Sequence, residues 1–309
     1  MRQFLSLVVL ILAAWPLPAQ SHASERPVPI SGPPATIADM VAGSAAARPL
    51  SINSGFGPDY EILLPVVINS PGLNGTFFKT DGFFANFRNI NQEVLVRFIP
   101  QGVSATGQPP LRTSLTALTN VAAADLLGPE SDLARTGVGA LLITAVLPLT
   151  DIVDTSAKLL GLFRIWTPQP GSAGTVSFGA WGPPSDNIHG LNGAIALGLR
   201  QNAAFRTNIG LVNLDPVNTR SWAVTFRSGG TPITQTITLL PLSMQLVAVP
   251  ATVTPSQNGY LTVTYIPFDT PGTDFRWSAF GVSADNVTGD SWLSLATQSA
   301  TLPVNPGGD

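Results

Sequence analysis

An internal repeat limits the folds that this chain can adopt. The runs Phe78-Lys-Thr-Asp81 and Asn86-Phe87 return 127 residues later as Phe205-Arg-Thr-Asn208 and Asn213-Leu214. Each copy spans about 115–130 residues, which suits one β-sandwich and is too long for a solenoid unit. The repeat therefore predicts two related domains in tandem.

Short runs rich in Val, Ile and Thr, separated by Gly, Pro and Asn, predict strands throughout both copies. Ile233–Thr238 alternates apolar and polar residues with the period of two that is typical of a half-buried strand. The expected strands are 61–69, 77–87, 92–99, 111–119, 138–147, 158–167 and 174–181 in the first copy, and 193–200, 203–214, 220–228, 232–240, 243–249, 259–267, 274–284 and 290–297 in the second.

The pair Phe163-Arg164 recurs in the second copy as Phe275-Arg276. Neighbouring residues of a strand point to opposite faces, so we expect each Phe in a core and each Arg on an outer sheet face. The run Asn120–Leu127 departs from the strand pattern. It opens with a capping residue and contains helix-favouring residues, so it predicts one or two helical turns at one end of the first sandwich.

The first 23 residues have the features of a signal peptide. Arg2 supplies the positive start, Phe4–Trp15 is apolar, and Ser21-His22-Ala23 places small residues at a cleavage site. A membrane anchor is the alternative, but the apolar run is short for a spanning helix. We expect a secreted or periplasmic/extracellular protein with no membrane span after removal of the signal. Residues 24–58, rich in Pro, Ala and Ser, predict a flexible leader.

Composition narrows the possible partners. Charged residues make up 11% of the chain and the net charge is −3, which argues against nucleic acid as a partner. The chain has no cysteine, so it has no disulfide framework, while a hydrophobic content of 44% is enough for a core.

Three segments carry a resemblance to a known group of proteins. Arg206–Asn213, Ser283–Asp290 and Phe163–Thr175 resemble elements of secreted bacterial proteins with tandem immunoglobulin-like β-sandwich repeats, whose function is uncharacterised. The resemblance covers about residues 60–300. It implies a surface or envelope location and no known catalytic residue. The first copy departs from the pattern, because it has no counterpart of Asp285-Asn286.

The predicted fold class is therefore all-β, with two tandem immunoglobulin-like antiparallel β-sandwiches related by internal duplication. The expected boundaries are residues 59–186 for the first sandwich, 187–303 for the second, and 304–309 for a C-terminal tail.

Catalytic chemistry has little support in the sequence. His189 would be the only histidine left after removal of the signal, and it lies at the expected domain junction. It is a candidate general base, but a polar linker residue is the favoured interpretation. The chain has no Gly-x-Ser-x-Gly motif, no cluster of His and Cys for zinc, and no Gly-rich phosphate loop. We expect no enzyme activity and no cofactor.

Two sets of residues are candidate binding sites. Asp285, Asn286 and Asp290 form an oxygen-rich run that is a candidate for calcium, but such residues also build tight turns without an ion, and the turn is favoured. Trp166 and Trp277 are candidates for stacking on sugar rings, although tryptophans of sandwiches are commonly buried.

These observations favour a non-enzymatic secreted β-sandwich protein with a structural, adhesive or protein-binding role at the cell envelope. The alternative is a carbohydrate-binding module that uses surface tryptophans. The expected partner is a protein or a glycan at the cell surface. Three or more tryptophans exposed on one face would favour the alternative.

Overall fold

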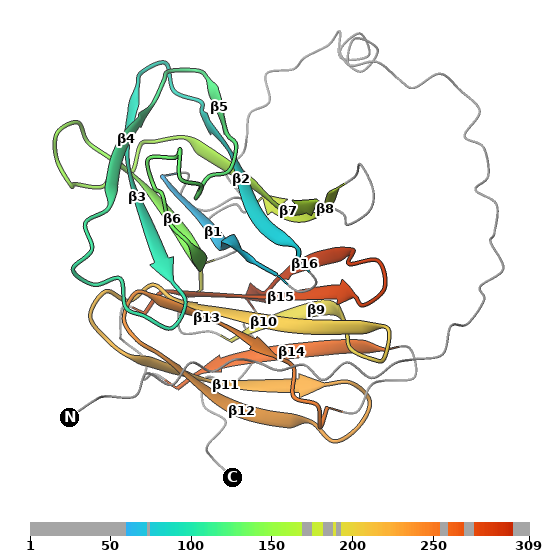
Figure 1. Cartoon of the computed structure of the whole chain (residues 1–309). Coiled ribbons are helices and arrows are strands. Elements are labelled where there is room, and N and C mark those ends of the chain that lie inside the picture. Colours follow the sequence, from blue (N-terminus) through green and yellow to red (C-terminus); the bar gives the residue numbers. More distant parts are fainter. Residues whose placement is uncertain are drawn as a thin grey trace, which may run out of the picture. The chain divides into compact units, whose positions relative to one another are not determined.

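The computed structural model describes residues 60–72, 75–168, 175–181, 188–189, 193–253, 259–268 and 275–298 (Figure 1). All of them belong to one compact unit, Asn53–Asp309. The fold is all-β with antiparallel sheets, as predicted. Among these residues no helix is long and apolar enough to cross a membrane. The expected signal peptide, leader and C-terminal tail lie outside the described residues.

The first eight strands form two layers that are joined through β1. One layer has the order β4-β3-β6-β1, and the other has the order β5-β2-β7-β8. The end of β1 pairs with the start of β2, so the two layers are formally one sheet. The strands are β1 (Glu61–Pro71), β2 (Phe77–Asn86), β3 (Gln92–Pro100), β4 (Leu111–Leu115), β5 (Asn120–Ala123), β6 (Gly137–Val146), β7 (Leu159–Pro168) and β8 (Thr175–Trp181).

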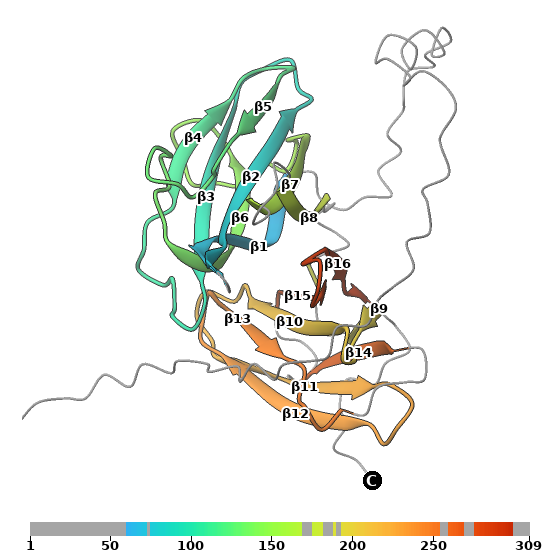
Figure 2. The same cartoon turned by 45° about the vertical axis from the view of Figure 1, so that its right-hand side comes forward.

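The remaining strands form a second sandwich of two separate sheets (Figure 2). Their orders are β12-β11-β14-β9-β17 and β13-β10-β15-β16. If β1 to β8 are matched with β9 to β16 in sequence, both orders repeat those of the first sandwich, with Phe78 in β2 and Phe205 in the matching β10. The strands are β9 (Ala194–Arg200), β10 (Phe205–Asn213), β11 (Arg220–Arg227), β12 (Ile233–Leu239), β13 (Ser243–Ala248), β14 (Tyr260–Pro267), β15 (Trp277–Asp285), β16 (Ser291–Leu295) and β17 (Thr297–Gln298).

The repeated asparagine has the same structural task in both copies. The side-chain amide of Asn86, which is buried, donates to the carbonyl oxygens of Ile90, Leu115 and Thr116, and its Oδ1 accepts from the amide of Arg88. Each such asparagine ties the end of its own strand to the end of a strand in the opposite layer. The corresponding bonds of Asn213 run to the carbonyls of Asn218, Leu239 and Leu240 and from the amide of Asp215.

The repeated threonine also joins the two layers of its sandwich. The Thr80 hydroxyl, in β2, donates to the Ile68 carbonyl of β1 and accepts from the Ile68 amide. The hydroxyl of Thr207, in β10, donates to the carbonyl of Arg200 at the end of β9. The repeated motif therefore holds the fold together, because a buried polar group stabilises the fold when its hydrogen bonds are made.

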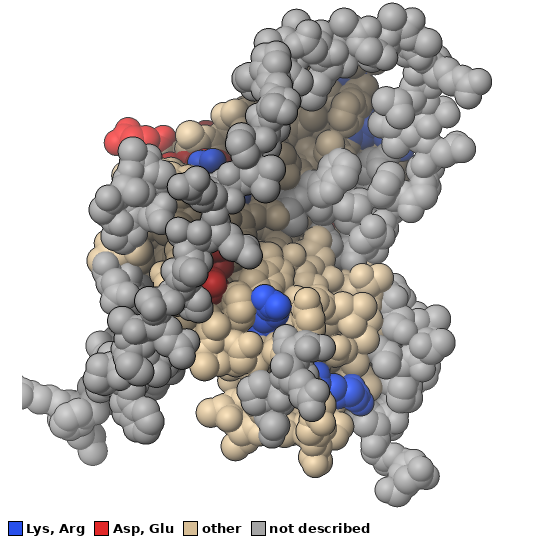
Figure 3. Space-filling model, turned by 90° about the vertical axis from the view of Figure 1, so that its right-hand side faces the viewer, with Lys and Arg blue, Asp and Glu red and all other residues tan. Residues whose placement is uncertain are grey.

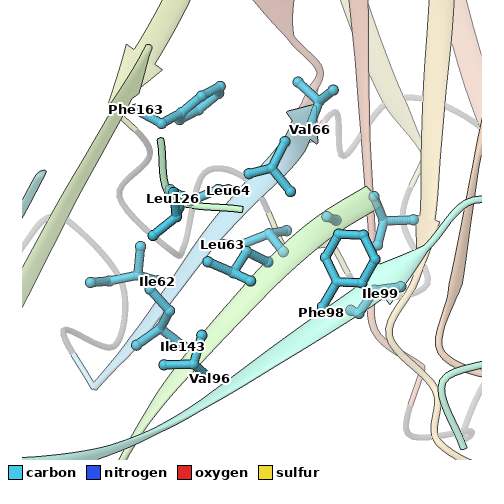
Figure 4. Close-up of a cluster of buried hydrophobic side chains, with 14 of the residues drawn as sticks. Ile62, Leu63, Leu64, Val66, Val96, Phe98, Ile99, Leu126, Ile143 and Phe163 are labelled. Atoms are coloured by element: carbon cyan, nitrogen blue, oxygen red, sulfur yellow. The ribbon is translucent and has the colours of Figure 1, made fainter. Parts of the chain in front are cut away.

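Two hydrophobic clusters form the core. The first lies between the layers of the first sandwich, where Ile62, Ile143 and Phe163 are buried (Figure 4). The second lies between the sheets of the second sandwich and is rich in aromatic rings, with Trp222 and Trp277 fully buried. The first cluster continues into residues of β10, β13 and β15, which pack against it from the second sandwich.

The expected helical turn at Asn120–Leu127 is wrong. Residues Asn120–Ala123 form the short edge strand β5, and turns follow it. In β5, Ala122 pairs with Phe83 and Asn120 pairs with Ala85. The backbone hydrogen bonds offered by the edge of β2 outweigh the modest helix propensity of this short run.

The two Phe-Arg pairs do not occupy equivalent positions, and only Arg164 lies on a strand face, because Arg276 precedes β15. Phe163 and Phe275 are buried, while their Arg neighbours are partly exposed. However, Phe163-Arg164 lies inside β7, whereas Phe275-Arg276 precedes β15. Asn86 pairs with Leu159 and Asn213 pairs with Trp277, so Phe275 matches Ala157 in register.

Candidate functional site

The imidazole of His189, in the connection between β8 and β9, lies inside the molecule and is 1% exposed. The His189 amide donates to the carbonyl of Trp277 at 2.7 Å, and the ring meets the Trp277 indole edge-on with centroids 4.8 Å apart. Neither ring nitrogen has a hydrogen-bond partner within the described structure. Burial lowers the pKa of His189 to about 4, outweighing the opposing effect of the Ala296 backbone. The ring is neutral at pH 7 and inaccessible to a substrate.

The oxygen-rich run at the end of β15 forms a turn in which the oxygen atoms of Asp285 and Asn286 accept hydrogen bonds from protein groups. Asp285 Oδ1 accepts hydrogen bonds from the amides of Val287 and Thr288, at 2.7 and 2.9 Å. These two backbone bonds lower the pKa of Asp285 below its usual range. Asn286 Oδ1 accepts from Arg206 Nη1 at 2.8 Å. No group of three or more acidic or histidine side chains within the described ranges could hold a metal ion. The geometry is that of an Asx turn.

The candidate tryptophans lie in different environments. Trp277 is fully buried in the second core, so it offers no face to a sugar ring. Trp166 lies on β7 and is half-buried, with the Arg164 guanidinium 5.6 Å from its ring centroid. Trp222 is also fully buried, and the half-buried Trp292 donates its indole N–H to the Gly198 carbonyl. The side chain of Trp181 lies outside the described residues.

A small pocket lies beside the edge of β3. Its volume is about 190 Å³, below the usual range of 300–1,000 Å³ for small-molecule sites. Arg97 Nη1 donates to the Gln108 carbonyl at its rim. The pocket therefore offers little room for a substrate. Its lining residues are Val96, Arg97, Phe98, Gln108, Pro109, Pro110, Leu111, Asp132, Leu133 and Arg135.

Exposed apolar side chains gather on the outer face of the layer β5-β2-β7-β8. Side chains of β2 alternate, so that Thr80, Gly82, Phe84 and Asn86 are buried while Phe83 is 41% exposed. On β7, Phe163 and Ile165 are buried while Leu162 is 43% exposed. Phe83 pairs with Leu162 and Ala85 pairs with Leu160, so these side chains are cross-strand neighbours.

These neighbours form what we call the apolar patch. Phe87, which follows β2 and is 50% exposed, extends it beyond the strand. Ala122 of β5 extends it on the other side through its pairing with Phe83. Contiguous exposed apolar side chains of this kind mark interaction sites more often than scattered ones do. The apolar patch consists of Phe83, Ala85, Phe87, Ala122, Leu160 and Leu162.

The other half of the same sheet face is charged, and its charges are paired. Arg164 Nη2 lies 3.3 Å from Asp81 Oδ2, and Lys79 Nζ lies 2.6 Å from Asp125 Oδ2. This half therefore carries little net charge. Figure 3 shows that charged side chains are sparse and scattered among uncharged ones on one face of the molecule.

No protein-family model matches the chain, and no curated protein matches its sequence.

Sequence reasoning missed the apolar patch, although one signal was present. Phe83 and Phe84 are adjacent in one expected strand, and adjacent strand residues must face opposite sides. One of the two rings therefore had to leave the core between the layers. Phe84 is buried and Phe83 is the exposed ring.

Proposed function

We propose that this is a non-enzymatic β-sandwich protein, exported to the cell envelope, that acts by binding other proteins. The single observation that supports this role is the apolar patch on the outer face of β2 and β7. Phe83 and Leu162 expose 41% and 43% of their surface side by side on rigid strands. Burial of such surface against a partner is favourable by about 25 cal/mol per Å² of apolar area.

Carbohydrate binding has weaker support. A glycan platform needs aromatic planes that are open to solvent, and two of the five tryptophans that follow the expected signal, Trp222 and Trp277, are fully buried. Trp166 is half-buried under Arg164, and Trp292 is half-buried beside Phe205. The apolar patch offers mostly aliphatic and phenyl surface, which suits the side chains of a protein better than sugar hydroxyls.

The proposed ancestry is a duplicated immunoglobulin-like sandwich of the kind found in secreted bacterial proteins with tandem repeats. Two observations support it. The strand orders of the two sandwiches correspond one to one, and the repeated Thr and Asn make corresponding hydrogen bonds in both.

A site-specific photo-crosslinker tests the protein-binding role. A photoreactive phenylalanine analogue at position 83, in cells that produce the protein, is expected to capture a protein. The same analogue at Val217, which is 75% exposed on the second sandwich, is the matched control and is expected to capture none. Equal capture from both positions, or none from position 83, would refute the role.

The proposed location is tested separately by mass spectrometry. The protein recovered outside the cytoplasmic membrane is expected to begin at Ser24, after removal of the predicted signal. Recovery of the uncut chain from the cytoplasm would contradict this proposal.

A further inference from the structure

The two central strands of the sheet β13-β10-β15-β16 in the second sandwich, β10 and β15, are buried on both faces over most of their length. The inner face of the sheet lines the second core through residues such as Ile209 and Ala279. Its outer face joins the first core, where Val212, Met244 and Phe280 are fully buried.

The covering partner of that outer face is the first sandwich of the same chain. The connection after β3 lies along β13, where the amide of Gly102 donates to the Met244 carbonyl at 2.9 Å. Ala105 donates in the same way to Leu242 at 2.9 Å, and the Ser104 hydroxyl donates to the Pro241 carbonyl at 2.6 Å. One face of this fold is therefore already used to bind a sandwich.

The apolar patch occupies the corresponding face of the first sandwich. Asn86 pairs with Leu159 in the first sandwich, and Asn213 pairs with Trp277 in the second. These pairings fix the correspondence of every position along the two pairs of strands. Phe83, Ala85, Phe87, Leu160 and Leu162 then match Gly210, Val212, Leu214, Ser278 and Phe280.

The two faces differ in what covers them. Phe280 is 0% exposed, whereas the matching Leu162 is 43% exposed. Leu214 is 5% exposed, whereas the matching Phe87 is 50% exposed. In the second sandwich this sheet face is covered by the first sandwich. The matching face of the first sandwich is apolar, and its side chains are exposed.

We propose that the apolar patch binds the apolar patch of a second copy of this chain across a two-fold axis. This inference rests on the proposed protein-binding role and names the partner. A two-fold contact joins the same surface of two copies, and a second copy presents the same apolar side chains to the patch. The adjoining charges do not oppose the contact, because Arg164 is paired with Asp81 and Lys79 with Asp125.

A head-to-tail contact that copies the intramolecular one is disfavoured. The connection that covers β13 spans Gln101–Pro110, and it is already engaged within its own chain. The matching connection of the second sandwich spans only Ser228–Pro232 and is half as long. The second sandwich therefore lacks the segment with which the first sandwich covers its neighbour.

Sedimentation equilibrium of the purified full chain tests the proposal. We expect a concentration-dependent dimer with a Kd at or below about 100 μM. Phe83→Ser and Leu162→Ser are each expected to weaken the association by about tenfold or more, because each removes apolar surface from the centre of the contact. Val217→Ser is the matched control on an exposed position of the second sandwich, and we expect it to associate like the unsubstituted chain. Far-ultraviolet circular dichroism verifies that each variant is folded.

A single cysteine gives a second measurement that does not depend on weakening the contact. The chain has no cysteine, so Phe83→Cys places one unique thiol at the patch. We expect a disulfide-linked dimer on mild oxidation, and much less of it from Val217→Cys. A chain that remains monomeric at high concentration, or a dimer that is unaffected by both patch variants, would overturn the proposal.

The outcomes also separate this inference from the protein-binding role. A monomer in solution that captures a different protein through position 83 in cells contradicts the second copy as partner and supports protein binding. A monomer that captures nothing contradicts both.

Discussion

Acidification should destabilise the protein through one buried imidazole. His189 is buried against Trp277, and this burial lowers its pKa to about 4. The unfolded chain has the ordinary histidine pKa of about 6.5. Between these two values the unfolded state binds the proton and the folded state does not. The contribution of His189 to the free energy of unfolding is therefore fully present above pH 6.5 and is lost as the pH falls towards 4.

The size of the loss follows from the two pKa values. At pH 4.5 the imidazole is almost fully protonated in the unfolded chain and mostly neutral in the folded protein. The difference lowers the free energy of unfolding by about 2.5 kcal/mol relative to pH 7.5. The buried carboxyl of Asp215, with its pKa lowered to about 2, adds its own loss only at still lower pH.

Urea denaturation of the native chain and of His189→Leu measures the effect. Fluorescence of the buried Trp222 and Trp277 reports the transition at pH 7.5, 6.5, 5.5 and 4.5. The variant removes the titrating group, so the two chains should diverge by about 2.5 kcal/mol between the extremes of pH. Parallel pH dependence of the two chains would refute the assignment of a neutral, buried imidazole.

Three further outcomes are expected. Asn86→Ala and Asn213→Ala should each lower the free energy of unfolding by about 3 kcal/mol in denaturant melts, because each leaves buried carbonyl groups without a donor. A loss of stability in only one of the two variants would contradict the equivalent roles of these asparagines. Asp285→Ala should lower the free energy of unfolding by about 1 kcal/mol, because two backbone amides lose their acceptor. The unsubstituted chain should have the same melting temperature in calcium and in chelator. A rise in melting temperature on addition of calcium would mean that the loop binds the ion. Arg276→Ala should cost about 1–3 kcal/mol in denaturant melts because it leaves the buried carboxylate of Glu61 without its cation, and a negligible cost would refute that pairing.

The strand pattern was predictable because alternation and turn residues are local signals. All fifteen expected strands are present within a few residues of their expected limits. The short strands β5 and β17 were missed. In β5 the Ala-rich run Asn120–Ala123 has no strand signal of its own, and its conformation depends on the edge of β2, which lies far away in sequence.

The register between the copies was less predictable than the strands. Matching Phe163-Arg164 with Phe275-Arg276 relied on two residues, whereas the backbone pairing of Asn86 and Asn213 fixes a different alignment. A slip between alignments leaves local patterns intact, so only the cross-strand partners could reveal it.

The environments of individual side chains could not be read from local sequence. Alternation places Trp277 on one face of its strand, but it does not say whether that face lies in a core or in water. The same limit applies to His189, whose burial depends on its pairing with Trp277 across a long stretch of chain. The outward face of β2 was similarly invisible, because exposure depends on whether another layer covers the sheet.

The burial of β10 and β15 on both faces of their sheet has a consequence for the order of assembly during synthesis. Translation starts at the N-terminus, so every strand of the first sandwich is made before β9. The loop Gln101–Ala105 can therefore already be in place when β13 arrives to pair with it. Nascent Val212 and Phe280 then meet a preformed apolar surface, which shortens the time during which they are open to aggregation. The reverse arrangement of the two sandwiches would leave that sheet face uncovered until the chain was finished.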